Sequence, residues 1–359
     1  MNFTSDNSHG AAPGIIEAMA RANDGALGSY GADPLAARVE GRLRDIFETD
    51  LRVFLVTTGT AANALALASV SPPWGTVFCH HGAHIAEDEC GAPEFYGGGL
   101  TLRHLPGENA RIDANALAAS VEECGARGVH QTQPAAVSLT NLTERGALYS
   151  PDETAALADI AHANGCAVHL DGTRFANAVV ASGHSPADLS WRAGVDILCL
   201  GATKNGALAA EAVIYFDPER QAAAISSFEF RRKRGGHLVS KGRMLSAQMN
   251  AWLEGDFWLD RAGQSNAMGQ RLLEGLRRVD GVEILNDAVA NIIFARLPLA
   301  VHRRLRAAGA AYYLDPAAQT EEGDGLSVGV RLVCSPSTVA GDVDAFLGHC
   351  TGEPAEMTA

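Results

Sequence analysis

Two side chains of opposite charge stand at corresponding places in the sequence, each after an apolar run. Asp171 follows the run 166–170, and Lys204 lies shortly after the run 195–200. Runs of this length and composition predict buried strands, and the segment 185–193 between them is long enough for a helix. Because ligands of open α/β sheets bind beyond the carboxyl ends of the strands, we expect Asp171 and Lys204 to meet in one crevice, close to Arg174.

An amine and a carboxylate in one crevice suit a particular chemistry. A lysine can form a Schiff base with a carbonyl compound. A neighbouring aspartate can keep a pyridine nitrogen protonated, because its charge favours the cationic ring. Pyridoxal 5'-phosphate needs both groups from its protein, so this pair of residues points to that cofactor.

Further motifs occur in an order and at a spacing that match a known family. They are His84, Thr58-Gly59-Thr60-Ala61-Ala62-Asn63, Asp171-Gly172-Thr173-Arg174 and Thr203-Lys204-Asn205-Gly206. Together they resemble the L-threonine aldolases of low specificity, and the similarity runs from about residue 5 to about residue 349. The resemblance implies a pyridoxal-phosphate enzyme, a lyase that cleaves L-threonine, L-allo-threonine and related β-hydroxy amino acids to glycine and an aldehyde.

The resemblance also implies a fold and an assembly. The fold is α/β, pyridoxal-phosphate fold type I, with a mostly parallel seven-stranded sheet in a large domain and a small α+β domain at the C-terminus. We assign residues 1–255 to an N-terminal arm and the large domain, 256–350 to the small domain, and 351–359 to a disordered tail. The stretch 255–261 is the expected junction. The family further implies a homodimer or, as in most of its aldolases, a homotetramer, a dimer of dimers.

Local signals place the ends of several helices. Asp33 followed by Pro34 predicts a helix start, since aspartate caps a helix and proline suits its first position; this helix should end near Glu48. Ser150-Pro151-Asp152-Glu153 is a capping box that opens a helix leading to the strand before Asp171. These helices are structural, and they deliver the chain to the predicted site.

For the cofactor, the resemblance assigns individual roles. Lys204 would hold it covalently, Asp171 would hold its ring nitrogen, and His84 would stack on the ring and exchange protons. The turn at Gly59 and Thr60 enters a run of good helix formers, and a helix N-terminus offers free N–H groups to a phosphate. The resemblance implies that this turn binds the cofactor phosphate. Further cofactor contacts that it implies are Arg174, Lys233 and Lys241, the two lysines partly from a neighbouring subunit.

For the substrate, Arg331 gives the clearest signal. It lies in the apolar run 328–333, and a buried arginine needs an anion. That anion is either a core carboxylate or the α-carboxylate of a substrate, and the resemblance favours the second. The substrate-binding residues that it implies are Ser5, Tyr30, Arg174 and Arg331.

One position departs from the family pattern. Some threonine aldolases carry a second histidine near the leaving aldehyde, and this chain has Thr143 at about that place. The sequence therefore leaves open which group removes the proton of the β-hydroxyl.

Three alternatives remain at this stage. The residues His80, His81 and His84, followed by Glu87, Asp88 and Glu89, could form a metal site, although the glycine at 82 weakens that pattern and we expect no metal. A related pyridoxal enzyme, such as a β-eliminating lyase, an aminotransferase or a glycine hydroxymethyltransferase, would share the lysine and the aspartate. A non-catalytic scaffold is disfavoured because both of these residues are present.

Composition limits the partners and the compartment. The chain has 359 residues, of which 47% are hydrophobic and 19% charged, with a net charge of -14. An acidic surface argues against nucleic acid and anionic membranes as general partners. The 7 cysteines form no Cys-x-x-Cys pair, and no apolar run is long enough to span a bilayer. We therefore expect a cytoplasmic enzyme.

Overall fold

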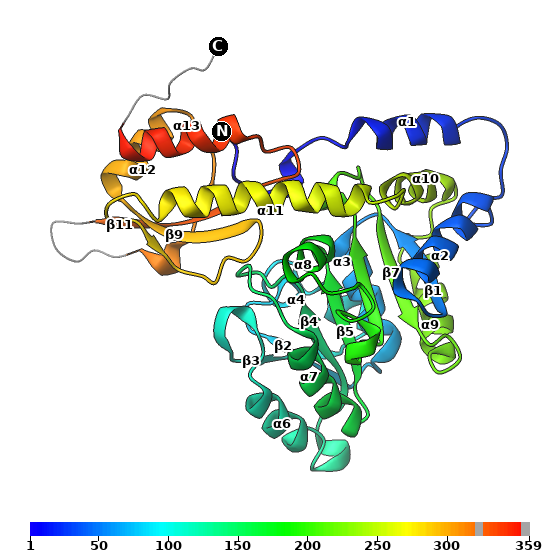
Figure 1. Ribbon diagram of the computed structural model, residues 1–359. Helices are drawn as coiled ribbons and strands as arrows, with labels where there is room; N and C mark the ends of the chain where they lie inside the picture. Colours follow the sequence, from blue (N-terminus) through cyan, green and yellow to red (C-terminus); the bar gives the residue numbers. More distant parts are fainter. Residues whose placement is uncertain (320–325, 353–359) are drawn as a thin grey trace.

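The computed structural model describes residues 1–319 and 326–352 and contains two sheets (Figure 1). The larger has seven strands in the order β1-β7-β6-β5-β4-β2-β3. These strands are β1 (Leu51–Val56), β2 (Gly75–His80), β3 (Thr101–Leu105), β4 (Gln133–Thr140), β5 (Ala167–Gly172), β6 (Ile197–Gly201) and β7 (Glu211–Phe216). The pairs from β3 to β6 are parallel, and β7 runs antiparallel to both β6 and β1. The prediction of a mostly parallel seven-stranded sheet is therefore confirmed.

Helices cover both faces of this sheet. Along β7, Tyr215 joins a core with Phe54 and Phe228, while Ile214 and Phe216 join the core on the opposite face. Alternate residues of a strand point to opposite faces, so a strand buried on both sides must be apolar almost throughout. The first face is covered by α3 (Gly59–Val70), α5 (Ala92–Gly97) and α9 (Ala222–Arg234), the second by α2 (Pro34–Phe47), α6 (Ala114–Glu123), α7 (Pro151–Ala163), α8 (Phe175–Ser182) and α10 (Arg243–Trp252).

The smaller sheet belongs to a second unit with its own core. Its order is β10-β11-β9-β8, all antiparallel, with β8 (Glu283–Ile284), β9 (Ile292–Pro298), β10 (Tyr313–Leu314) and β11 (Ser327–Val333). The helices α12 (Leu299–Ala307) and α13 (Ala340–Thr351) pack with it, and the long α11 (Phe257–Leu276) reaches from this unit to α8 (Figure 1). Thus the small α+β unit predicted for the C-terminal part is present.

The N-terminal arm joins both units. Phe3 is fully buried in the core of the small unit, where its ring lies 5.0 Å from that of Phe346. Farther along, α1 (Pro13–Ala22) packs on α10 of the large unit. The arm therefore passes from the small unit to the large one within its first twenty or so residues.

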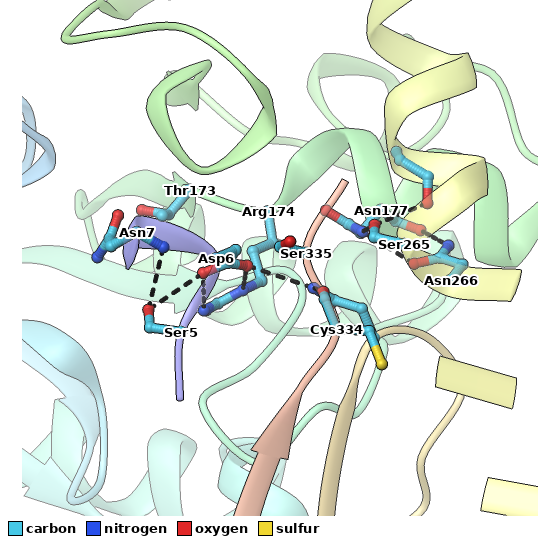
Figure 2. Close-up of polar contacts among 12 residues, drawn as sticks. Ser5, Asp6, Asn7, Thr173, Arg174, Asn177, Ser265, Asn266, Cys334 and Ser335 are labelled. Atoms are coloured by element: carbon cyan, nitrogen blue, oxygen red, sulfur yellow. Dashed lines mark hydrogen bonds and ion pairs between the residues drawn. The ribbon is translucent and has the colours of Figure 1, made fainter. Parts of the chain in front are cut away.

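The link between the units is polar and buried. The amide nitrogen of Asn177 on α8 donates to Ser265 Oγ at 2.9 Å and to Asn266 Oδ1 at 2.8 Å, both on α11 (Figure 2). Asn266 donates in return to the carbonyl oxygen of Asn177. A buried polar cluster in which the donors find acceptors favours one relative placement of two helices.

The capping motifs predicted two helix starts correctly, but the helix predicted between two of the strands is misplaced. Asp33 caps α2, and the Ser150 capping box opens α7, as predicted. The prediction of a helix over residues 185–193 is wrong: the helix between β5 and β6 is α8, and the later segment is turns followed by a short 3-10 helix (Trp191–Ala193). Ser185 and Ser190 bond to backbone and side-chain groups within that segment, and such local bonds compete with a helix.

Two further observations concern the ends and the helices. Residues Thr351 and Gly352 close α13, and the remainder of the predicted tail, 353–359, lies outside the described residues. Among the helices that the structure describes, none combines the length and apolarity needed to cross a bilayer.

Candidate active site

The carboxyl ends of the parallel strands gather the predicted residues. Asp171 lies near the end of β5, and Lys204 lies in a short 3-10 helix, η5 (Thr203–Asn205), that follows β6. The two strands are neighbours, with Asp171 in register with Cys199. Gly201 permits this approach, since a Cβ there would lie 2.7 Å from the backbone of Thr173. As expected from the two apolar runs, the aspartate and the lysine are near enough for their charges to interact.

Asp171 is held as a carboxylate. Its Oδ1 accepts from the backbone N–H of Thr173 at 2.9 Å and from the Thr173 hydroxyl at 2.6 Å, and its Oδ2 accepts from Asn63 at 2.8 Å. Burial alone would raise the pKa of Asp171, but the two hydrogen bonds from Thr173 and the charge of His84 bring it below the ordinary value. The group thus offers a negative charge in a buried place, as a pyridinium partner must.

The surroundings of Lys204 favour its neutral amine more than water does. Burial lowers its pKa, and the positive charge of Arg174 lowers it further. The turn that presents it is braced by Thr203, whose hydroxyl donates to Glu211 at 2.5 Å. Burial raises the pKa of Glu211 to about 7. A lysine with a lowered pKa is a better nucleophile at neutral pH than one in water.

His84 is fixed at its ring and at its backbone. Its Nδ1 lies 2.8 Å from Glu89 Oε1, and its backbone N–H donates to Glu144 Oε1 at 2.8 Å. The hydrogen bond with Glu89 raises the pKa of His84 despite partial burial. Asn63 donates to Glu89 as well as to Asp171, so one amide connects the histidine pair with the aspartate.

The three-histidine arrangement that the sequence allowed is not assembled. The Nε2 of His80 lies 3.2 Å from the carbonyl of Gly107, and the Nδ1 of His81 lies 3.3 Å from the carbonyl of Leu105. Within residues 1–319 and 326–352, the one group of potential metal ligands is His84 with Glu89 and Asp171. Hydrogen bonds through Asn63 account for the closeness of these three residues.

The predicted carboxylate-binding residues converge from three parts of the chain. Arg174 forms a bidentate ion pair with Asp6 of the arm, at 2.8 Å for both contacts (Figure 2). Ser5, beside Asp6, caps the short 3-10 helix η1 (Asp6–Ser8). Arg331 comes from β11; burial lowers its pKa to about 10, and the nearby charge of Arg174 contributes. Within the described residues its guanidinium has no hydrogen-bond partner, and no carboxylate lies within ion-pair distance.

The predicted phosphate turn borders the same site. Thr58 caps α3 by accepting from the N–H of Ala61, and the N–H groups of Gly59 and Thr60 belong to the first turn, which has no partner inside a helix. A Cβ added at Gly59 would lie 3.7 Å from the hydroxyl of Thr173. The helix N-terminus therefore opens beside the loop that follows Asp171.

Four predicted or suspected residues lie elsewhere. Tyr30 and Lys233 pair with each other, the ammonium lying 4.6 Å from the ring centroid. Tyr30 also lines a groove with residues of α2, β1, α9 and α10. Lys241 is exposed on the loop before α10. Thr143 is fully buried, donates to Asn109 O and accepts from Ala147 N. The hydroxyl of this threonine is engaged by its own loop and by the distant 3-10 helix Glu108–Ala110, so it does not take the place of a catalytic histidine.

The sequence analysis missed four contributors. Asn63 stands one helical turn after Gly59, and that spacing alone would have put it on the same side of α3. Glu89 was considered only as a metal ligand, and Asp6 and Glu144 were not considered. Burial raises the pKa of Glu144 to about 7, and its buried Oε2 has no hydrogen-bond partner among the described residues. No local sequence pattern predicts this environment.

Comparison with known proteins agrees with this geometry. Residues 2–297 match the family described as Beta-eliminating lyase. The chain is 38% identical over 338 residues to the low specificity L-threonine aldolase of Pseudomonas aeruginosa, covering 94% of this chain and 93% of that protein. The solved structure of Leishmania major threonine aldolase has a TM-score of 0.87 at 25% identity, covering 96% of this chain and 97% of that one.

A more distant neighbour shows the fold alone. A structure described as SPT with PLP has a TM-score of 0.69 at 14% identity, covering 98% of this chain and 86% of that one. Together these neighbours confirm the predicted α/β architecture of fold type I pyridoxal-phosphate enzymes.

Proposed function

Because this chain belongs to the beta-eliminating lyase family, among relatives that are low-specificity L-threonine aldolases, we propose that it is a lyase that cleaves L-threonine and L-allo-threonine. The β-hydroxyl loses its proton, the Cα–Cβ bond breaks, and an aldehyde leaves. The electron pair that remains on Cα takes up a proton, which gives glycine. The observation that carries this proposal is the convergence of Lys204, Asp171 and two arginines at the carboxyl edge of the sheet.

The site fits pyridoxal 5'-phosphate. Lys204 would hold its carbonyl carbon through an amine whose pKa burial lowers, and Asp171 would hold its ring nitrogen. The N–H groups at the start of α3, near Gly59 and Thr60, would receive its phosphate. When bound, the cofactor supplies an electron sink for the pair left on Cα.

The protein's own groups would bind the substrate and move its protons. Arg174, Arg331 and Ser5 would bind the α-carboxylate. The hydrogen bond to Glu89 occupies Nδ1 of His84. Nε2 has no hydrogen-bond partner among the described residues, and it would accept the β-hydroxyl proton. The amine of Lys204 would return a proton to Cα.

We further propose a homotetramer in the cytoplasm. Lys233 and Lys241 would approach the cofactor of a neighbouring subunit, and Tyr30 would approach the substrate there. Phe95 and Phe230 have exposed fractions of 79% and 77%, and exposed rings of this kind favour contact between subunits. The cysteines are all free, which suits a reducing compartment. Light scattering of the purified protein measures the assembly directly.

The experiment is aldehyde release, measured through coupled NADH oxidation with L-threonine and L-allo-threonine, with and without a chelator. We expect release from both substrates, unaffected by the chelator and lost in Lys204→Ala. The chain has only three lysines, so borohydride reduction and peptide mapping identify the one that holds the cofactor. Modification of Lys204 without aldehyde release would refute the aldolase proposal and favour β-elimination, which pyruvate release from L-serine then tests.

A further inference from the structure

The N-terminal arm places one carboxylate among the cations of the site. Asp6 is 4% exposed and interacts with the charges of Arg174, Lys204 and Arg331. Burial alone would raise the pKa of Asp6, but these positive charges bring it below its ordinary value. The carboxyl group is therefore ionised, and it faces more positive charge than it can neutralise.

The contact between Asp6 and Arg174 uses one edge of the guanidinium. Nε donates to Oδ2 and Nη2 donates to Oδ1, each at 2.8 Å (Figure 2). A guanidinium carries five N–H donors in a planar fork, so this contact leaves both donors of Nη1 available. Within the described part of the chain, Nη1 of Arg174 has no hydrogen-bond partner.

Asp6 itself is held from the small unit. Asn291 donates to Asp6 Oδ2 at 3.3 Å and to the carbonyl of Cys334 at 2.8 Å. Three residues before Asp6, the backbone of Phe3 bonds to Ala311 and Val333. The carboxylate is thus fixed to β9 and β11, while the arginine that it contacts follows β5 of the large sheet.

We propose that Asp6 is a positioning residue for the substrate: it fixes the guanidinium of Arg174 so that the Nη1 edge, together with Arg331, receives the α-carboxylate. The inference rests on the proposed function for the identity of the substrate. Arg174 and Arg331 bring two positive charges near the single negative charge of Asp6, so one positive charge is left to match the α-carboxylate of an amino acid. The contact also ties the small unit, which carries Arg331, to the arginine of the large unit.

The competing interpretation is that Asp6 occupies the place of the substrate carboxylate and must leave when an amino acid binds. The two interpretations predict opposite effects of removing its charge. If Asp6 positions Arg174, Asp6→Asn weakens binding of the carboxylate. If Asp6 competes for the arginine, the same change strengthens binding.

The test compares two ligands on the cofactor-loaded protein by calorimetry. L-2-Aminobutyrate is threonine without its hydroxyl, so it binds without being cleaved, and propylamine lacks the carboxylate as well. For Asp6→Asn we expect the Kd of L-2-aminobutyrate to rise about tenfold or more, as for a lost contact to a charged group. The Kd of propylamine should change less than about threefold, because that ligand makes no carboxylate contact.

The chain offers a matched control. Asp344 forms the same bidentate contact with Arg271, at 2.7 and 2.9 Å, on the exposed surface of α13 and α11. Asp344→Asn should leave both dissociation constants unchanged. If Asp6→Asn raises both dissociation constants equally, Asp6 has a general structural role and the proposal is wrong. Unchanged or tighter binding of L-2-aminobutyrate would also overturn it.

A second variant keeps the test decisive if Asp6→Asn does not fold. Asn291→Ala removes the hydrogen bond from the small unit to Asp6 and leaves the ion pair with Arg174. It should therefore weaken the binding of L-2-aminobutyrate selectively, but by less than Asp6→Asn. No effect there would contradict the proposal. The aldolase proposal is tested independently of this one. If the wild type releases no aldehyde but Asp6→Asn still weakens the binding of L-2-aminobutyrate selectively, the role of Asp6 stands and only the proposed reaction is wrong.

Discussion

The contact between His84 and Glu89 allows a prediction about the pH dependence of the reaction. A buried carboxylate 2.8 Å from Nδ1 makes Nε2 more basic and stabilises the histidine after it accepts a proton. A hydrogen bond to a charged group is worth ~1.5–3 kcal/mol. If that stabilisation is lost in the transition state, Glu89→Gln should lower kcat/KM by roughly 10- to 150-fold.

The direction of the pH effect follows from the same contact. Glu89 raises the pKa of His84, and only neutral histidine can accept the β-hydroxyl proton, so wild-type activity should fall as the pH drops through this raised value. Glutamine keeps the shape and removes the charge. The pKa of His84 then falls, and the acid limb of kcat/KM should move to lower pH. Since the two groups are in contact, the apparent pKa that the acid limb reports belongs to His84 and Glu89 together.

The assay is the coupled aldehyde measurement across the neutral pH range at constant ionic strength. Glu87→Gln is the control, because Glu87 is exposed on the same short helix α4 (His84–Glu87); its profile should match that of the wild type. An acid limb in Glu89→Gln at the wild-type position, with less than about a threefold loss in kcat/KM, would refute the reasoning.

Two further predictions concern stability. Phe3→Ala should lower the free energy of unfolding by about 3–5 kcal/mol, because Phe3 is fully buried against Phe346; in denaturant titrations of the cofactor-free protein, a loss below about 1 kcal/mol would mean that the arm is not packed. Burial raises the pKa of Glu144 to about 7. Above the ordinary pKa of a glutamate, the unfolded state loses this proton while the folded state keeps it. The free energy of unfolding should therefore fall as the pH rises towards 7. Glu144→Gln resembles the protonated acid and should reduce that fall; thermal unfolding curves with parallel pH dependence in both proteins would contradict it.

Much of the site was readable from the sequence because the strands are apolar and end abruptly. The runs before Asp171 and Lys204 predicted two buried strands, and the parallel sheet then required both residues to lie at the same edge. Arg331 was readable for a related reason, since a charge inside an apolar strand must find an anion. The capping residues Asp33 and Ser150 fixed helix starts through contacts within one turn of the backbone.

The tertiary structure alone decided which charged groups meet. Asp6 and Arg174 are separated by 168 positions, and Asn291 by 285 from Asp6; hydrophobic periodicity reports which face of an element is buried, but carries no information on such pairs. Glu89 is only five positions from His84, but the sequence offered it as a metal ligand, and the folded structure shows that it contacts the histidine ring instead. The local sequence thus determines the strands and the reactive residues that follow them. The groups that orient these residues depend on how the two units and the arm pack together.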